Sequence, residues 1–536
     1  MFNKILRKIF ININRNSNKC QTTQATNQDE LLSAHLQTNL TNFRQIFGDS
    51  IDLVIREFKI GVERQLSAGI LYIDGLIDKR LVNEDILKPL MLECSTAEPN
   101  RKLSKEKVFD WVKESALSVG DLKEANTKDE LINGLLSGET AIFLAGTKTA
   151  LLVSSSGWET RGVEEPDTEA VVRGPREGFT ENLKTNTALL RRKIKNPNLR
   201  FELIKLGNQT NTNVCITYIK GICNENFVTE ARKRLKHIKT DSILESGYIE
   251  AFIEDAPYSP FATVANSEKP DVTAAKILEG RLAVLVDGTP IALTVPYLFM
   301  EGFQSSEDYY SRPYYVTLVR WIRFLAFFIT VYLPSLYVAA TTFHQELIPT
   351  PLLVTMIAAK EGTPFPAFVE ALLMGLVFEI LREAGVRMPR PIGQAVSIVG
   401  ALVIGEASVS AGLIGAPMVI VVALTGITSF INSSLIDAVS LLRLMLVGLA
   451  ATMGFYGVLI GTVAIIVHLA SLRSFGVPYF SPIAPMSLVD LKDILIRVPL
   501  WAMSTRPRIL RSPNRRRLAP WLKPLPPPDD ANFNYD

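Results

Sequence analysis

Some of the carboxylates in the C-terminal half of this sequence lie within long apolar stretches, and three of them are candidates for chemistry: Glu370, Glu379 and Glu406. Glu370 and Glu379 occur in a stretch that also carries Arg382 and Glu383, whereas Glu406 stands alone among apolar and small residues. A charged side chain in such a segment faces protein or water, because its transfer into lipid is costly, and it often marks an ion pathway or a proton relay. We interpret Glu406 as the leading candidate for a functional charge inside a membrane. A hydrogen-bonded structural carboxylate is the alternative at this position.

Motifs for catalysis in water are missing from the sequence. The four histidines, at positions 35, 237, 344 and 468, form no HExxH, and there is no GxSxG, Walker A or GxGxxG motif. The four cysteines, Cys20, Cys94, Cys215 and Cys223, form no CxxC, so we expect reduced, packed thiols and no metal site. We therefore expect no enzymatic activity and no cofactor.

Charge is distributed unevenly along the 536 residues. The net charge is only +3, which argues against a nucleic-acid partner, since such binding needs concentrated Lys and Arg. Charges are sparse from residue 322 to 469, and the first 310 residues read as a charged globular protein. We expect five parts: a mobile basic and polar tail over 1–29, soluble α/β subdomains over 30–170 and 171–310, an all-α multi-span membrane domain over 311–472, and a basic, proline-rich cytoplasmic tail over 473–536.

The two soluble subdomains repeat one pattern. The string GETAIFLAGT at 138–147 matches GRLAVLVDGT at 280–289 with identical spacing, and in each case apolar strands flank a glycine turn. Such a pattern predicts a β-hairpin, here about Gly146 and about Gly288. Chance similarity of short apolar strings is the alternative to a true repeat.

A basic loop with Gly174, Pro175 and Gly178 lies at the start of the second subdomain, and we expect Thr180 to cap the helix that follows. Arg173, Arg176 and Lys184 near this helix start suit an anion, although a solvated basic face or a salt-bridge network is the better interpretation.

Long apolar runs predict several membrane crossings after Pro313. The first run, 314–343, exceeds the roughly 20 residues that a helix needs to cross a bilayer. Basic and aromatic residues at the ends of such runs predict interface anchors; these are Arg320, Trp321, Arg323, Arg387, Arg390 and Arg443. Five crossings from a cytoplasmic start would leave the basic tail outside. Either the charged 352–383 stretch does not cross or the long 439–469 stretch is broken in two, so we favour four or six crossings.

Several long strings resemble the A subunits of GerA-type spore germinant receptors. They are EGFQSSEDYY at 301–310, VRGPREGFTE at 172–181, PRPIGQAVSIVGALVIGEA at 389–407 and FGVPYFSP at 475–482. The likeness extends over nearly the whole chain after residue 30.

The resemblance implies a location in the inner membrane of a bacterial spore, with the soluble domain on the core side. It implies assembly with a transporter-like B subunit and a lipoprotein C subunit, and a role in starting germination when nutrients are sensed. A subunits of this family are proposed to oligomerise as nutrient-gated cation channels, and rings of carboxylates select for cations. Under this interpretation Glu370, Glu379 and Glu406 are the candidate ion-pathway residues.

Three alternatives remain open at this point. In the first alternative, the chain is a signal transducer without a pore of its own, and partner proteins carry the ions. A secondary transporter is disfavoured, because two matching halves with interrupted helices are not found. A ligand bound between the two α/β subdomains is the third alternative.

Overall fold

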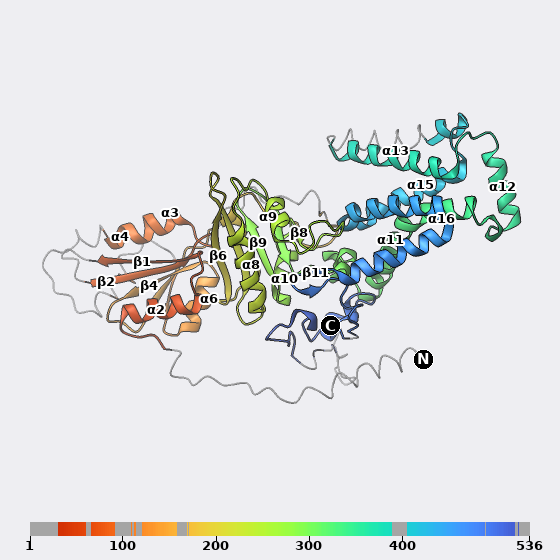
Figure 1. The fold of residues 1–536 in the computed structure, drawn as a ribbon. Coiled ribbons are helices and arrows are strands. Elements are labelled where there is room, and N and C mark those ends of the chain that lie inside the picture. Colours follow the sequence, from red (N-terminus) through yellow and green to blue (C-terminus); the bar gives the residue numbers. More distant parts are fainter. Residues whose placement is uncertain are drawn as a thin grey trace, which may run out of the picture. The chain divides into compact units, whose positions relative to one another are not determined.

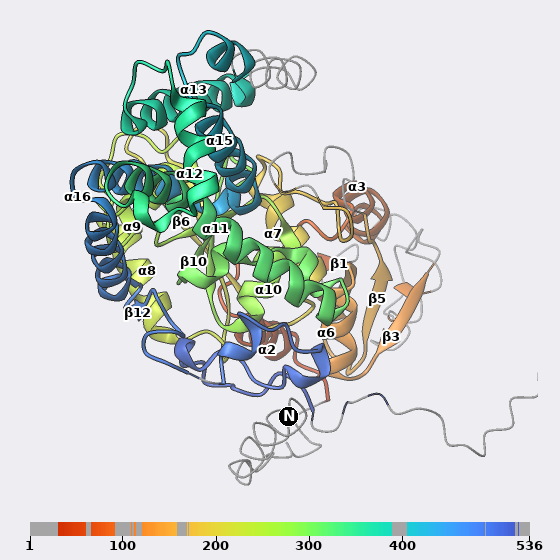
Figure 2. The same cartoon turned by 90° about the vertical axis from the view of Figure 1, so that its right-hand side faces the viewer.

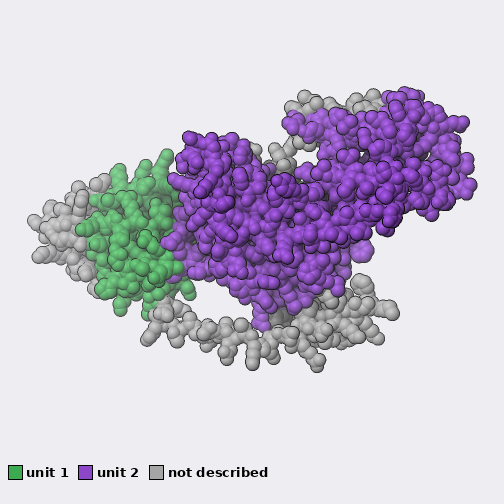
Figure 3. All heavy atoms as spheres, in the orientation of Figure 1, with its two compact units in different colours: residues 1–45, 53–158 green, residues 46–52, 159–536 purple. Residues whose placement is uncertain are grey.

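The computed structural model of the chain describes residues 31–60, 66–91, 121–157, 171–387, 405–487 and 489–519, with a few isolated residues besides. Two compact units are present, one made of residues 1–45 and 53–158 and the other of residues 46–52 and 159–536 (Figure 3). The predicted tail over 1–29, together with Cys20, Cys94 and Arg390, lies outside the described residues.

The first unit contains an antiparallel five-stranded sheet with the order β1-β2-β4-β5-β3 (Figure 1). The predicted hairpin about Gly146 is confirmed, and Gly146 has a φ of 95°, which glycine adopts without a steric penalty. The strands are β1 (Leu53–Ile60), β2 (Leu66–Ile73), β3 (Leu122–Ala125), β4 (Glu139–Leu144) and β5 (Ala150–Ser154). The helices are α2 (Leu36–Phe47), α3 (Lys79–Leu81), η1 (Val82–Leu87), α4 (Lys88–Met91) and α6 (Lys128–Leu136).

The sheet of the second unit has the equivalent order, β6-β7-β9-β10-β8, as the internal repeat predicts. Gly288 turns its hairpin with a φ of 92°. The strands are β6 (Leu199–Leu206), β7 (Thr212–Ile219), β8 (Ala265–Ser267), β9 (Leu282–Val286) and β10 (Ala292–Val295). The helices are α7 (Leu183–Lys193), α8 (Glu225–His237), α9 (Ser246–Ile253) and α10 (Pro270–Glu279).

Helices cover both faces of this second sheet. Side chains alternate along a strand, so Val214 and Ile216 pack with α8 and α9, whereas Cys215 packs with α7 and α10. Cys215 and Cys223 are free, buried thiols, and burial raises the pKa of each to about 12. The prediction of reduced, packed thiols is confirmed for these two cysteines.

The predicted cap of α7 is wrong. Asn182 caps the helix, because its side-chain oxygen accepts a hydrogen bond from the Lys184 N–H at 2.9 Å. Thr180 lies upstream of the helix, where its N–H donates to the Asn186 side chain at 2.8 Å. The basic side chains of Arg173, Arg176 and Lys184 are exposed.

The C-terminal part of the second unit is helical, as the sequence predicts. Its helices are α11 (Pro313–Thr342), α12 (Thr350–Lys360), α13 (Ala367–Arg387), α15 (Ala416–Ser429) and α16 (Ile436–Ser471). Within the described residues, 313–342 and 416–471 are the helical stretches that are long and apolar enough to cross a membrane. α11, α15 and α16 pack together (Figures 1 and 2).

Short turns connect these parts: η4 (Phe299–Phe303) and η5 (Ser306–Tyr309) precede α11, η6 (Gln345–Leu347) follows it, and η7 (Phe430–Leu435) joins α15 to α16. Beyond α16 lie β11 (Arg473–Ser474), β12 (Val477–Pro478), η8 (Leu491–Asp493), η9 (Leu500–Ala502) and η10 (Arg508–Leu510).

α16 reverses direction at Gly454, which has a φ of 59° and a ψ of −140°. A Cβ placed on Gly461 would lie 2.5 Å from Leu446, although 15 residues of straight helix span about 22 Å. A Cβ on Gly457 would likewise overlap the carbonyl of Leu449. The long apolar stretch is therefore broken in two, and residues 436–453 and 455–471 run antiparallel with these glycines between them.

The chain after α16 packs back on the second α/β domain. Phe475, Val477 and the fully buried Leu510 belong to the core formed by β7, β9, α8 and α9. Ser512 donates a hydrogen bond to the Ile222 carbonyl at 2.6 Å, and Arg506 donates one to the Leu278 carbonyl at 2.8 Å. The segment predicted as a tail over 473–536 thus contributes to the folded domain as far as residue 512.

Candidate functional site

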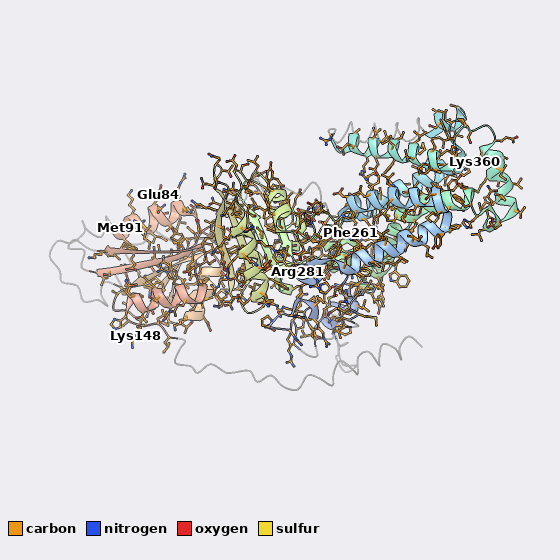
Figure 4. The ribbon with its side chains drawn as sticks, viewed as in Figure 1. Glu84, Met91, Lys148, Phe261, Arg281 and Lys360 are labelled. Atoms are coloured by element: carbon orange, nitrogen blue, oxygen red, sulfur yellow. The ribbon has the colours of Figure 1, made fainter. Side chains whose placement is uncertain are left out.

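Glu370, in the first turn of α13, is fully buried. One carboxylate oxygen accepts a hydrogen bond from the Gly415 N–H at 3.4 Å, and the other lies 3.9 Å from the Lys360 ammonium. Lys360 in turn lies 5.3 Å from the ring centre of Tyr337 on α11. Lys360 is at the opposite end of the helical part from Phe261 (Figure 4). The Glu370 carboxylate therefore holds the end of α12 and the start of α15 against α13.

Glu379 is bound by two arginines. Its carboxylate lies 2.5 Å from Arg443 on α16 and 2.5 Å from Arg382 on its own helix. Ser440 donates a third hydrogen bond at 3.3 Å and also accepts one from Arg382. This cluster carries a net positive charge, so it fixes α13 to α16 and is unsuited to attracting a cation.

Glu406 is exposed on the short helical turn over 405–410, and within the described residues it forms no ion pair. The three carboxylates therefore have different environments. Glu370 and Glu379 are nine residues apart, which places them on opposite faces of α13 about 14 Å apart along its axis. Of the three, Glu406 alone presents an unneutralised carboxylate at the surface of the described helices.

A second charged cluster joins α11 to the linker that precedes it and to the segment that follows α16. The fully buried Arg320 lies 2.9 Å from Asp308 in η5 and 3.0 Å from Asp493 in η8. Arg323 approaches Asp308 at 2.9 Å, and the Tyr309 hydroxyl donates to Asp493 at 2.7 Å. Burial and the nearby Asp493 raise the pKa of Tyr309 well above its usual value. The cluster ties the start of α11 to the linker before it and to the C-terminal segment.

A cavity of about 90 Å³ lies beside this cluster. Charged side chains of both signs line it, including Glu279, Arg281, Glu301 and Asp493. Arg281 pairs with Glu301 at 2.5 Å, and burial raises the pKa of the Glu279 carboxyl. One water needs about 10–15 Å³, so several waters or a small polar molecule would fit. The lining acids and bases pair with one another, so the cavity shows no preference for one sign of charge.

The comparisons with known proteins agree on one family. The profile described as "Bacillus/Clostridium GerA spore germination protein" matches residues 41–509. Spore germination protein KA of Bacillus subtilis (strain 168) is 46% identical over 508 residues, which cover 94% of this chain and 92% of that protein. This chain belongs to the GerA family of spore germination proteins. The resemblance to A subunits of GerA-type germinant receptors is thereby confirmed.

Two further similarities concern this GerA-family protein. The uncharacterized membrane protein YfkQ of Bacillus subtilis (strain 168) is 41% identical over 483 residues, 90% of this chain and 92% of that protein. The solved N-terminal domain of the A subunit of the Bacillus megaterium spore germinant receptor GerK3 is 39% identical, covering 50% of this chain and 97% of that chain, with a TM-score of 0.40.

The predicted interface anchors have distinct surroundings in the GerA-family fold. Arg320 and Arg323 bind Asp308, as described above, whereas Trp321 is 59% exposed and its indole N–H donates to the Leu495 carbonyl at 2.9 Å. Arg387 is exposed and pairs with Glu383 at 2.6 Å, one turn away on α13. Arg443 is the partner of Glu379. Arg390 is outside the described residues.

Sequence reasoning missed Asp308 and Asp493, the acids that hold Arg320. A signal was available for Asp308, because an acidic residue 12 positions before a helical arginine at the start of an apolar run is a candidate ion-pair partner. No comparable signal marks Asp493, which is 173 residues away from Arg320 in the sequence.

Proposed function

We propose that this chain is the membrane-spanning A subunit of a spore germinant receptor and that several copies form a nutrient-gated cation channel. The receptor lies in the inner membrane of the spore, with the α/β domains on the core side, and assembles with a transporter-like B subunit and a lipoprotein C subunit. Family membership supports the role in germination. The channel rests on one observation, the exposed Glu406 carboxylate without an ion pair in the described helices.

The break in α16 favours six crossings. Five apolar stretches that each cross once would leave the N- and C-terminal segments on opposite sides of the membrane. α16 is divided at Gly454 into two antiparallel halves. This division adds one crossing to the five, and the even number keeps both terminal segments on one side.

Substitution of Glu406 by Gln tests the channel. In spores that carry this variant, nutrient-triggered release of monovalent cations is expected to slow, because a neutral amide attracts cations less strongly than a carboxylate. The Glu406→Asp variant is expected to retain most of the release. Glu383→Gln is the matched control, because Arg387 already neutralises that exposed carboxylate. Receptor abundance is measured by immunoblot in each strain.

Unchanged release in Glu406→Gln spores with normal receptor abundance contradicts the pore role of this residue. A transducer without a pore is the second candidate, and the cluster of Arg320, Asp308 and Asp493 supports it because it links the α/β domain to α11. Purified chain reconstituted in planar bilayers separates the two: conductance favours the channel, and its absence from correctly assembled oligomers favours transduction.

A further inference from the structure

In the segment between Ser481 and Leu500 the exposed side chains are apolar and the charged side chains are less exposed, which is the reverse of an ordinary protein surface. Among its described residues, every exposed position is apolar; these are Ile483, Pro485, Met486, Leu495, Ile496 and Leu500. Met486 is 73% exposed and Leu500 54%. The charged residues of the same segment are less exposed, and Arg497 is buried to 3% exposure. A segment that faces water shows the reverse arrangement, because apolar surface is removed from water on folding.

The polar groups of this segment hold it against the protein. Asp493 binds Arg320 and accepts the Tyr309 hydroxyl, and its carbonyl accepts a hydrogen bond from Gln304 at 2.7 Å. The Arg497 N–H donates to Thr317 on α11 at 3.2 Å. These contacts fix which side of the segment points inward, so the exposure of Leu495 and Ile496 follows from the fold and does not reflect a loose chain.

The segment lies at a defined height on α11. The Trp321 indole donates to the Leu495 carbonyl, so Leu495 and Ile496 are level with the third turn of this helix. From Trp321 to Thr342 the helix rises about 32 Å at 1.5 Å per residue, close to the roughly 30 Å thickness of a bilayer core. Tryptophan is enriched at the boundary of that core. The exposed apolar surface continues on α11 through Leu318 and Leu325, each 60% exposed.

We propose that the described residues 483–487 and 489–500 form a non-spanning lip that rests in the membrane interface, with Met486, Leu495, Ile496 and Leu500 among the lipid acyl chains near the headgroups. The proposal rests on the proposed membrane crossing of α11. Lipid is the occupant because the patch is continuous with the exposed apolar face of that helix at the level of Trp321, and because none of the charged residues described within the segment itself is exposed. The lip holds the start of α11 and the linker before it at the bilayer surface, because its polar groups bind Arg320, Thr317 and Gln304.

Site-directed spin labelling of the full chain tests the lip. Single cysteines at Met486 and Ile496 are labelled, in a background without the native cysteines, in vesicles of phosphatidylethanolamine and phosphatidylglycerol. Leu459, 60% exposed on the second half of α16, is the control for a lipid-facing crossing, and Leu203, 40% exposed on β6, is the apolar control for water. Collisions with dissolved oxygen and with a water-soluble nickel complex are measured at each site.

The expected result is that Met486 and Ile496 resemble Leu459, with oxygen collisions exceeding nickel collisions several-fold, and that Leu203 shows the opposite ratio. A ratio like that of Leu203 at both lip positions, or exclusion of both reagents by a second protein surface, overturns the lip while leaving a lipid-facing Leu459 intact. A water-like ratio at Leu459 overturns the membrane crossing, and the lip with it.

Discussion

Replacing Gly454 by alanine tests the reversal of α16. The φ of 59° and ψ of −140° at this residue lie close to a region that only glycine adopts freely, and a side chain there costs about 1–3 kcal/mol. An added Cβ would also lie 2.8 Å from the His344 ring and 3.0 Å from the Phe343 Cβ, so a neighbour must move. The substitution therefore disfavours the antiparallel pair of helices relative to a straight helix.

Gly448 supplies the matched control. It lies in the first half of α16, and a Cβ placed there would meet no heavy atom within 4 Å. Gly448→Ala is expected to be neutral or to stabilise the helix by up to about 1 kcal/mol. Residue 448 is helical in both the bent and the straight form, so Gly448→Ala leaves the equilibrium between them unchanged. The two variants should thus differ by about 1–3 kcal/mol, which is roughly 5-fold to 140-fold in the equilibrium between the bent and straight forms.

A disulfide between cysteines at Leu446 and Gly461 reads out this equilibrium. The two positions touch in the reversed helix, whereas about 22 Å would separate them in a straight one. Disulfide yield is measured by mass spectrometry of proteolytic fragments from membranes, together with the apparent unfolding temperature in detergent. Equal yields and equal unfolding temperatures for the Gly454→Ala and Gly448→Ala variants would refute the argument.

Two further predictions concern stability. Arg320→Leu removes the buried partner of Asp493 and one of the two arginines that bind Asp308, and should cost up to about 3–5 kcal/mol. Arg387→Leu, which removes an exposed helical pair, should cost only about 0.3–0.5 kcal/mol. Thermal denaturation in detergent compares the two variants, and similar losses would contradict a structural role for the buried cluster. Burial, with Glu254 and Glu245 nearby, raises the pKa of Glu250 to about 7. The folded chain thus binds this proton more tightly than the unfolded chain, and stability falls as pH rises from about 4.5 through 7. Glu250→Gln should therefore unfold at a higher temperature than the unsubstituted chain at pH 8 and at a similar one near pH 4, and an equal difference at both pH values would be inconsistent with this titration.

Local signals in the sequence were sufficient for the α/β domains. The hairpins about Gly146 and Gly288 follow from apolar runs on either side of a glycine, and in both cases the pattern that predicts the turn lies within about ten residues of sequence. The cap of α7 was misplaced by two residues, because Thr180 and Asn182 are both good capping types and the choice depends on the side chain of Asn186.

Pairings across long distances were not accessible from the sequence. Glu379 and Arg443 are 64 residues apart, and neither carries a local mark of its partner. The reversal at Gly454 was one of two alternatives, because the apolar run continues through it and several other glycines surround it. The positive charge and the prolines after residue 500 are typical of a chain that is exposed to solvent. They therefore gave no reason to predict that Leu510 enters the core.

The contribution of the C-terminal segment to the core of the second α/β domain affects how the protein is made. Val228 on α8 and Leu510 belong to one core, yet ribosomes extend a chain by about 5–20 residues per second, so Leu510 emerges roughly 14–56 s later. During that interval the described helices α11, α12, α13, α15 and α16 are synthesised, while the position of Leu510 in the core of the nascent domain stays unfilled. Folding of this domain therefore ends only after translation has passed the last helix. A chain truncated directly after α16 would contain all five strands of the sheet but would lack Leu510 in the core.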